Sequence, residues 1–349
     1  MAEMIMDKGS RLLRFGPRRI EKDDLLAFAA VFDPQPVHLD EHAARATPLH
    51  GLAASGWHTC ALITRALEEA LAGEDGYLGM TGVDELRWLR PVRPDDELCG
   101  EVKWGAFAQC LCQPALQRRP AWVEARNELG EIVLRWSCHM LFGRSAQKQK
   151  GVVHTVAPSC EMRRARSARA APRLGDHFIK YFEDVVRGDA IVLGSHLFDC
   201  SDVAMFEGIL TGARTRVDRR VARRKMQVSG WHVGAAWMRL IVEYYERRAK
   251  ELAAAGGSVP ILGPATGLRW VRWPAPVSIG DRITFTGWVE HKVNAASHGR
   301  WGLLVAGGEG RNERGEVVVS FYPQFLLERR PVDRLSPPCE GSVGLGSGR

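Results

Sequence analysis

The hydrophobic pattern of the chain changes from helical spacing to alternation. Apolar residues recur at helical spacing from about Ala54 to Leu71, and Gly73 offers a plausible stop. The segments that follow are rich in β-forming residues, and residues 97–107 alternate between apolar and polar positions as a half-buried strand does. One long helix followed by several strands predicts an α+β domain, with a sheet wrapped around a central helix. We expect the strands at residues 86–90, 97–107, 121–128 and 132–142.

Shorter elements precede the central helix. Residues 11–20 read as a strand, and residues 25–30 form an apolar helical turn. Acidic residues at positions 23 and 24 stand where a helix dipole favours them. A loop with two prolines then runs from Asp33 to His38, and a second short helix is expected at residues 40–46.

The second half of the chain repeats the first in order and spacing. Residues 229–232 (Ser-Gly-Trp-His) repeat residues 55–58 at an offset of 174, and residues 272–273 (Arg-Trp) repeat residues 87–88 at an offset of 185. The second copy therefore carries about eleven extra residues between these motifs, and residues 246–259 are the natural place for them. This agreement indicates a tandem duplication.

The duplication divides the chain into two domains of ordinary size. We expect the first at residues 8–143 and the second at residues 176–330. The stretch between them, 144–175, is basic and lacks periodicity, as an interdomain linker does. The tail at 331–349 is rich in Gly and Ser and is expected to be disordered.

Composition narrows the class of protein. A hydrophobic fraction of 45% and a charged fraction of 26% are typical of a soluble globular chain. No apolar run approaches the roughly 18 residues that span a bilayer, and residues 1–8 do not read as a secretory signal, so we expect a cytoplasmic protein with no membrane partner. The eight cysteines form no CxxC pair, which predicts reduced, mostly buried packing residues and no metal site.

The net charge of +7 raises nucleic acid as a partner, but no nucleic-acid-binding motif accompanies it. Much of the excess sits in residues 163–169 and 214–225. The first cluster reads as a solvated linker. The second is either a solvated surface or a contact for a phosphate-bearing small ligand. We therefore expect no nucleic-acid partner.

Asp33 and His38 are the candidate catalytic pair. When Phe28 is aligned with Phe206, Asp33 falls opposite Thr211 and His38 opposite Arg216. The second copy has kept the scaffold and lost both residues. In the first copy alone, Asp33 could cap a turn and His38 could simply be hydrogen-bonded to its neighbours. Such a structural role would require both residues in both copies. We infer one working centre per chain.

A carboxylate and an imidazole that converge on one point can hold and activate a water molecule. A helix that starts at Gly56 offers free backbone N–H groups to a developing oxyanion. Addition of water to an α,β-unsaturated thioester, or its removal, needs a polarised carbonyl, a placed water and a proton donor. We expect this chemistry without a cofactor or a metal.

These residues also carry a family resemblance. Residues 33–38 (Asp-Pro-Gln-Pro-Val-His), with Ala44 six residues on and residues 54–56 (Ala-Ser-Gly) after them, resemble the MaoC-like dehydratases and the (R)-specific enoyl-CoA hydratases, or hydratase 2, of the hotdog fold. The chain departs from their motif at Gln35, where Asn is usual, and at Phe32, where Gly is usual. The resemblance covers about 10–143 and 181–328, which is nearly the whole chain.

The resemblance implies a double hotdog, in which two α+β domains pack as a pseudo-dimer within one chain. It implies that Asp33 and His38 activate the catalytic water and that the Gly56 N–H polarises the thioester carbonyl. Gln35, Ser55 and Thr64 are the implied substrate-binding residues. The implied reaction is reversible hydration of a trans-2-enoyl-CoA, or of a carrier-bound thioester, to the (R)-3-hydroxyacyl thioester, as in fatty acid metabolism. The degenerate C-terminal half would shape the acyl tunnel, and chains could pair as homodimers.

Two other functions remain open from the sequence. A thioesterase of the same fold usually places its carboxylate on the central helix, and none lies between Ala54 and Ala66. A non-catalytic subunit that binds acyl-CoA is supported by the degenerate second half. His58 and His232 occur in both copies, so a packing role beside the neighbouring tryptophans is favoured for them.

Overall fold

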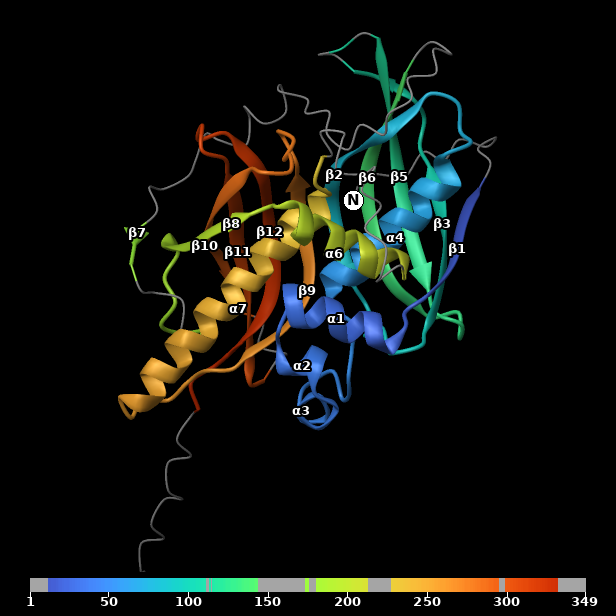
Figure 1. The fold of residues 1–349 in the computed structure, drawn as a ribbon. Coiled ribbons are helices and arrows are strands. Elements are labelled where there is room, and N and C mark those ends of the chain that lie inside the picture. The colour runs from blue at the N-terminus through green and yellow to red at the C-terminus, as the bar shows by residue number, and fades with distance from the viewer. Residues whose placement is uncertain are drawn as a thin grey trace, which may run out of the picture.

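The computed structural model describes residues 12–110, 113, 115–143, 173–175, 180–212, 227–294 and 299–331. Within these residues, the two halves of the chain join in one 12-stranded sheet, and the helices lie on one side of it (Figure 1). The predicted linker lies largely outside the described residues, as do residues 332–349 of the predicted tail.

The N-terminal half has the predicted order of elements. Its elements are β1 (Leu13–Arg19), α1 (Lys22–Phe32), α2 (Pro36–Leu39), α3 (Glu41–Arg45), α4 (Gly56–Leu71), β2 (Tyr77–Trp88), β3 (Glu97–Trp104), β4 (Ala108–Gln109), β5 (Leu116–Arg126) and β6 (Ile132–Gly143). The predicted loop from Asp33 to His38 is wrong in its second part, where α2 forms. The fixed φ of Pro36 at the first helical position suits the start of this single turn.

The C-terminal half repeats this arrangement. Its elements are β7 (Arg173–Leu174), β8 (Asp189–Leu197), α6 (Cys200–Thr211), α7 (Gly230–Ala254), β9 (Leu262–Arg272), β10 (Arg282–Val293), β11 (Trp301–Arg311) and β12 (Val317–Glu328). The central helix has 25 residues here against 16 in α4, so most of the insertion expected at residues 246–259 extends the helix.

The two halves meet edge to edge. The strand order is β1-β3-β5-β6-β2-β9-β12-β11-β10-β8-β7, and β2 pairs with β9 in antiparallel register, with Leu86 opposite Leu268. The strand pairs of the two halves are antiparallel except for the short pair of β7 with β8. The fold is therefore a double hotdog of the α+β class, as the sequence predicts.

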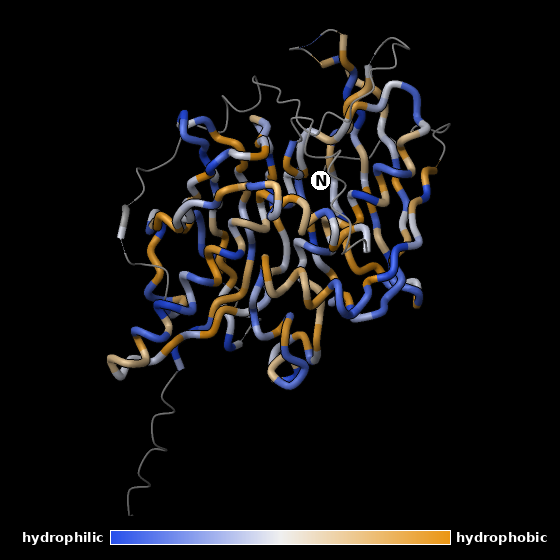
Figure 2. Tube along the Cα trace, viewed as in Figure 1, coloured by the Kyte–Doolittle hydropathy of each residue, from blue (hydrophilic) through white to orange (hydrophobic). Residues whose placement is uncertain are grey.

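The central helices pack against each other in front of this sheet, with the rings of Trp57 and Trp231 6.1 Å apart. Hydrophobic residues recur along the strands and helices (Figure 2). His58 stacks on Phe28 at 4.5 Å, and His232 stacks on Phe206 at 4.3 Å, so both histidines pack against a phenylalanine, where the sequence favoured packing beside the tryptophans. The described cysteines are all free thiols. No helix in the described ranges is long and apolar enough to cross a membrane.

Candidate active site

Asp33 is a buried carboxylate held at the end of α1. It follows the last helical residue, its backbone N–H donates to the Ala29 carbonyl at 3.0 Å, and the residue is only 2% exposed. Its Oδ1 accepts a hydrogen bond from Gln35 Nε2 at 2.8 Å, and its Oδ2 accepts one from Ser55 Oγ at 2.6 Å. Two donors therefore fix the position of the carboxylate.

His38 faces this carboxylate from α2. Its Nδ1 donates to the Ala53 carbonyl at 2.8 Å, and its Nε2 lies 3.4 Å from Asp33 Oδ2. Since a carbonyl can only accept, Nδ1 carries a proton, and Nε2 is the ring nitrogen that faces Asp33 and can exchange one. The side chain is buried, with 7% of the residue exposed. The structure thus brings the predicted pair together.

Ser55 joins the acid to the start of the central helix. It is the N-cap of α4, where its Oγ accepts from the Trp57 N–H at 3.2 Å while donating to Asp33. The residue is fully buried. One hydroxyl therefore satisfies an unpaired helix N–H and positions the carboxylate at the same time.

Gly56 is the first residue of α4, where its N–H has no preceding helical acceptor. A Cβ at this position would lie 2.5 Å from the indole of Trp88. Gly230 at the start of α7 meets Trp273 in the same way, at 2.4 Å. Glycine is therefore required at both helix starts by the approach of a tryptophan. The predicted oxyanion role concerns the Gly56 N–H and stays a prediction.

A large cavity opens beside these residues. Its volume is about 820 Å³, and Asp33, Gln35, His38 and Gly56 all contribute to its wall. Much of the remaining wall comes from the C-terminal half. Apolar and aromatic side chains supply most of that share, namely Trp237, Ile241, Tyr244, Tyr245, Leu268, Trp301, Leu304, Phe325 and Leu327. Asp33 is the only carboxylate in the described lining.

The structure treats the three predicted substrate-binding residues differently. Gln35 lines the cavity and contacts Asp33. Ser55 lies behind Asp33 and is not part of the lining, so its contact is with the acid. Thr64 is also outside the lining, and its Oγ1 accepts from Trp231 Nε1 at 2.7 Å. The geometry therefore gives Thr64 a place between the halves and lends no support to a substrate contact.

Arg93 is a site residue that the sequence reasoning missed. Its Nη1 donates to the carbonyls of Gly51 and Leu52 at 2.7 and 2.9 Å. These bonds fasten the segment that leads to Ala53, whose carbonyl holds His38. At the repeat offset of 185, the second copy carries Ser278 here. The second copy lacks this arginine as well as the acid–imidazole pair, and this shared absence in the repeat could have identified Arg93 as a site residue.

The structure describes one of the two positions that correspond to the pair in the second half. Thr211, which stands opposite Asp33 in the repeat, ends α6, and its Oγ1 donates to the Glu207 carbonyl at 2.9 Å. Arg216, the counterpart of His38, lies outside the described residues. Thr211 is bound within its own helix and offers no acid, so the described part of the second copy supports a single centre.

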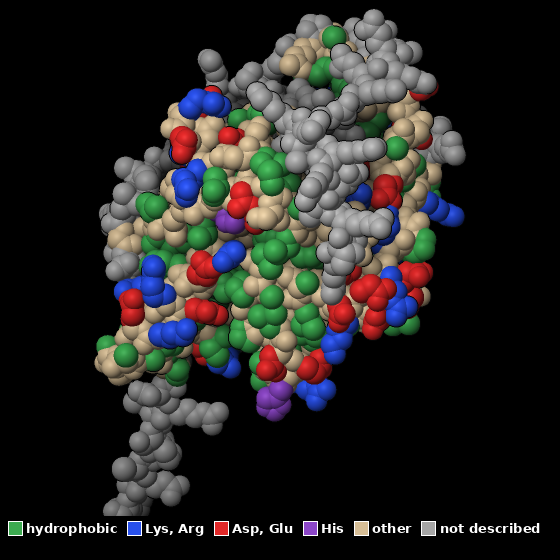
Figure 3. Space-filling model, viewed as in Figure 1, with side chains coloured by type: hydrophobic (Ala, Val, Ile, Leu, Met, Phe, Trp, Pro, Cys, Tyr) green, Lys and Arg blue, Asp and Glu red, His purple; other side chains and the backbone are tan. Residues whose placement is uncertain are grey.

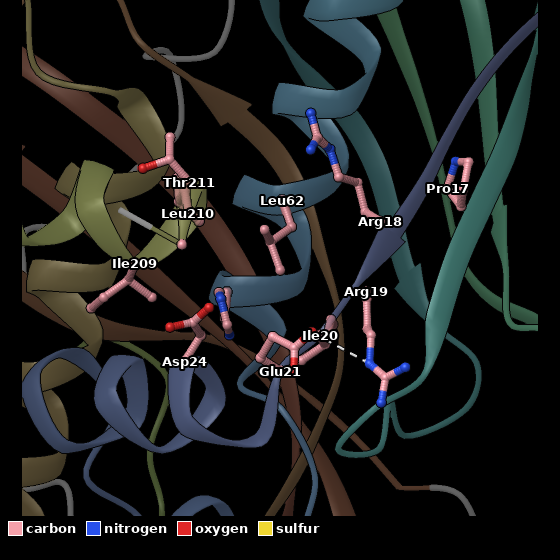
Figure 4. Close-up of a pocket in the computed structure, with 12 residues that line it drawn as sticks. Pro17, Arg18, Arg19, Ile20, Glu21, Asp24, Leu62, Ile209, Leu210 and Thr211 are labelled. Atoms are coloured by element: carbon pink, nitrogen blue, oxygen red, sulfur yellow. Dashed lines mark ion pairs between the residues drawn. The ribbon is translucent and has the colours of Figure 1, made fainter. Parts of the chain in front are cut away.

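A second, smaller cavity of about 220 Å³ lies where β1, α4 and the end of α6 meet (Figure 4). The arginines in its wall are paired, Arg18 with Glu69 and Arg19 with Glu21 and Asp95. On the face seen in Figure 3, Lys and Arg side chains are interspersed with Asp and Glu, and hydrophobic side chains gather near its centre. That face of the described chain has no continuous basic surface.

Comparisons with known proteins place this geometry in a family. The family model of the MaoC like domain matches residues 9–110. The uncharacterized protein YdeM of Bacillus subtilis (strain 168) is 34% identical over 122 residues, which cover 35% of this chain and 75% of that protein. The chain belongs to the MaoC-like dehydratase family.

Solved structures extend the likeness to both halves. A MaoC domain protein from Chloroflexus aurantiacus J-10-fl is similar with a TM-score of 0.64 and 14% identity, over 92% of this chain and 95% of that one. A conserved hypothetical protein from Mycobacterium tuberculosis, described as having a double hotdog fold, is similar with a TM-score of 0.59 and 14% identity, over 91% and 96% of the two chains. At 14% identity, the similarity to these two structures supports the fold alone.

Proposed function

We propose that this protein adds water reversibly to a trans-2-enoyl thioester and forms the (R)-3-hydroxyacyl thioester. The observation that carries the proposal is the buried Asp33–His38 pair at the wall of a large apolar cavity, beside the first N–H of α4. Membership in the MaoC-like dehydratase family supports hydratase or dehydratase chemistry in general.

In the proposed mechanism, a water molecule on the cavity side contacts both Asp33 Oδ2 and His38 Nε2, which lie 3.4 Å apart. The water oxygen bonds to C3 of the enoyl group while one member of the pair takes a proton from the water, and the pair returns a proton to C2. The negative charge that develops on the thioester oxygen is stabilised by the N–H of Gly56 at the positive end of α4. Dehydration follows the same steps in reverse. The hydrogen bond from His38 Nδ1 to the Ala53 carbonyl supports Nε2 as the ring nitrogen that exchanges a proton.

The cavity supports an acyl thioester as the substrate. Trp237, Ile241 and Phe325 from the second half give it an apolar wall that suits a hydrocarbon chain. Arg90 and Arg300 also line it, and cationic side chains suit the phosphates of coenzyme A or of a carrier-bound phosphopantetheine. The C-terminal half would therefore serve the N-terminal site. A cytoplasmic location and a homodimer of chains stay predictions.

The test is a spectrophotometric hydration assay with trans-2-enoyl-CoA substrates of increasing chain length. We expect the absorbance of the conjugated thioester to fall, the product to be the (R) isomer on chiral chromatography, and no free thiol to appear. Asp33→Asn and His38→Ala should each lower kcat/KM by on the order of 100-fold or more. Release of thiol without hydration would instead identify a thioesterase. Binding of acyl-CoA without turnover would identify a binding subunit, and either result would reject the proposal.

A further inference from the structure

A cluster of metal-ligating side chains lies in the C-terminal half, outside the candidate active site. His196 on β8, Asp202 on α6 and His232 on α7 bring one ligand atom each to within 4.8 Å of one another. His196 Nε2 lies 2.9 Å from Asp202 Oδ2, and His232 Nε2 lies 3.0 Å from the same oxygen. None of the three lines the large cavity.

The distances match those between ligands of one metal ion. Bonds of about 2.0–2.1 Å to imidazole nitrogen and carboxylate oxygen place two ligands of one ion about 2.9 Å apart at right angles and about 3.3–3.4 Å apart in a tetrahedral zinc site. The two nitrogen-to-oxygen distances in the cluster, 2.9 and 3.0 Å, lie at the short end of this range, and without an ion the 2.9 Å contact is a hydrogen bond between His196 and Asp202. Two imidazoles and one carboxylate are a ligand set that suits divalent transition metals.

The state of His232 points to a ligand as well. The side chain is 1% exposed, and its Nδ1 has no hydrogen-bond partner among the described residues. Its Nε2 lies 3.0 Å from Asp202 Oδ2, close enough for a hydrogen bond when Nε2 carries the proton. When the proton is on Nδ1 instead, Nε2 turns a lone pair toward this carboxylate and can offer it to a cation.

The first half of the chain provides an internal control. At the repeat offsets, Arg18, Asp24 and His58 stand where the second half has His196, Asp202 and His232. Arg18 points away from Asp24 and pairs with Glu69 on α4 (Figure 4). The fold therefore forms with a buried histidine on the central helix and without the added imidazole. The second imidazole of the cluster is present only in the second half, so the packing that both halves share does not require it.

We propose that His196, Asp202 and His232 bind one divalent transition metal ion such as Zn²⁺. The ion joins β8, α6 and the start of α7, and water completes its coordination on the side where His196 and Asp202 reach the surface. Its effect is to stabilise the second half, which carries the apolar wall of the cavity. This site departs from the sequence prediction of no metal, because its ligands are far apart in the chain and follow no metal-binding motif.

The test uses tag-free protein that has been freed of metal by a chelator and is titrated with Zn²⁺ by calorimetry. Wild type should bind one equivalent per chain and show a higher melting temperature when loaded. His196→Arg installs the residue of the first half and should weaken binding by more than about 100-fold, beyond what loss of an outer-shell partner costs. His291→Arg, at an exposed histidine on β10, is the matched control and should bind as wild type.

Cobalt gives an independent readout. Co²⁺ bound by the cluster should produce visible absorption bands in wild type and in His291→Arg, and none in His196→Arg or Asp202→Asn. If wild type takes up no stoichiometric Zn²⁺, the proposal is wrong whatever the variants do. Equal affinities of wild type and His196→Arg would also reject it, because the ion would then lie elsewhere.

Discussion

The hydroxyl of Ser55 performs two tasks, and its removal has a calculable effect. Ser55→Ala deletes the N-cap of α4, which costs about 1 kcal/mol of folding free energy. It also removes the 2.6 Å donor from Asp33 Oδ2, and a hydrogen bond to a charged group contributes about 1.5–3 kcal/mol. Because Asp33 is 2% exposed, bulk water replaces this donor poorly. We expect a loss of about 2.5–4 kcal/mol in the free energy of unfolding.

The repeat supplies a matched control for this change. Ser229 is the N-cap of α7 and has no side-chain cap hydrogen bond. Ser229→Ala should therefore change stability by less than about 0.5 kcal/mol. Both variants are compared with wild type by urea unfolding and by hydration of an enoyl-CoA. Ser55→Ala should also lower kcat/KM by on the order of 10-fold, because Asp33 is no longer positioned. Equal destabilisation by both variants, with full activity in Ser55→Ala, would refute the dual role.

Two further changes test the surroundings of the site. Arg93→Ala leaves the carbonyls of Gly51 and Leu52 without their donor, so it should lower the free energy of unfolding in urea by about 1–3 kcal/mol and also lower kcat/KM. Ser278→Ala, at the corresponding position of the second copy, should change neither quantity. Equal effects of the two variants would contradict the role assigned to Arg93. Burial lowers the pKa of His58 from 6.5 to about 3, so the unfolded chain gains a proton below pH 6.5 that the folded chain excludes. Stability due to this group is fully present above pH 6.5 and falls by about 1.4 kcal/mol per pH unit toward pH 3. His58→Phe should remove that slope in urea unfolding between pH 6 and pH 4.5, and an unchanged slope would show that His58 is protonated in the folded state.

The sequence predicted the fold because its signals are local or repeated. The helical spacing after Gly56 and the strand-forming segments that follow define one α+β unit with a sheet around a central helix, and the repeat at residues 229–232 defines the second. The resemblance supplies the hotdog fold for both. The pairing of β2 with β9 rests on the resemblance, since no local pattern specifies which edges join. The helical turn at Pro36 was missed because a Pro-Gln-Pro stretch reads as a turn when its neighbours are unknown.

The sequence predicted the reactive residues of the candidate site and missed a residue that supports them. Asp33 and His38 were found through their loss from the second copy, and the structure brings them together. Arg93 acts on backbone carbonyls, and such contacts leave no motif in a single sequence. Thr64 sits at the expected helical position, but the second copy places Trp231 against it. This contact depends on how the two halves pack against each other, and the sequence of one half does not contain that information.

The central claim is that each chain has one working centre, built on Asp33 in the first half. The direct measurement is the initial rate of enoyl-CoA hydration by Asp33→Asn beside Thr211→Ala, the same position in the second copy. Asn keeps the size of Asp and can still accept from Ser55, so the fold should persist, which circular dichroism checks. The account predicts that Asp33→Asn loses at least about 100-fold in kcat/KM and that Thr211→Ala keeps the wild-type rate. Full activity in Asp33→Asn, or an equal loss in both variants, would contradict it.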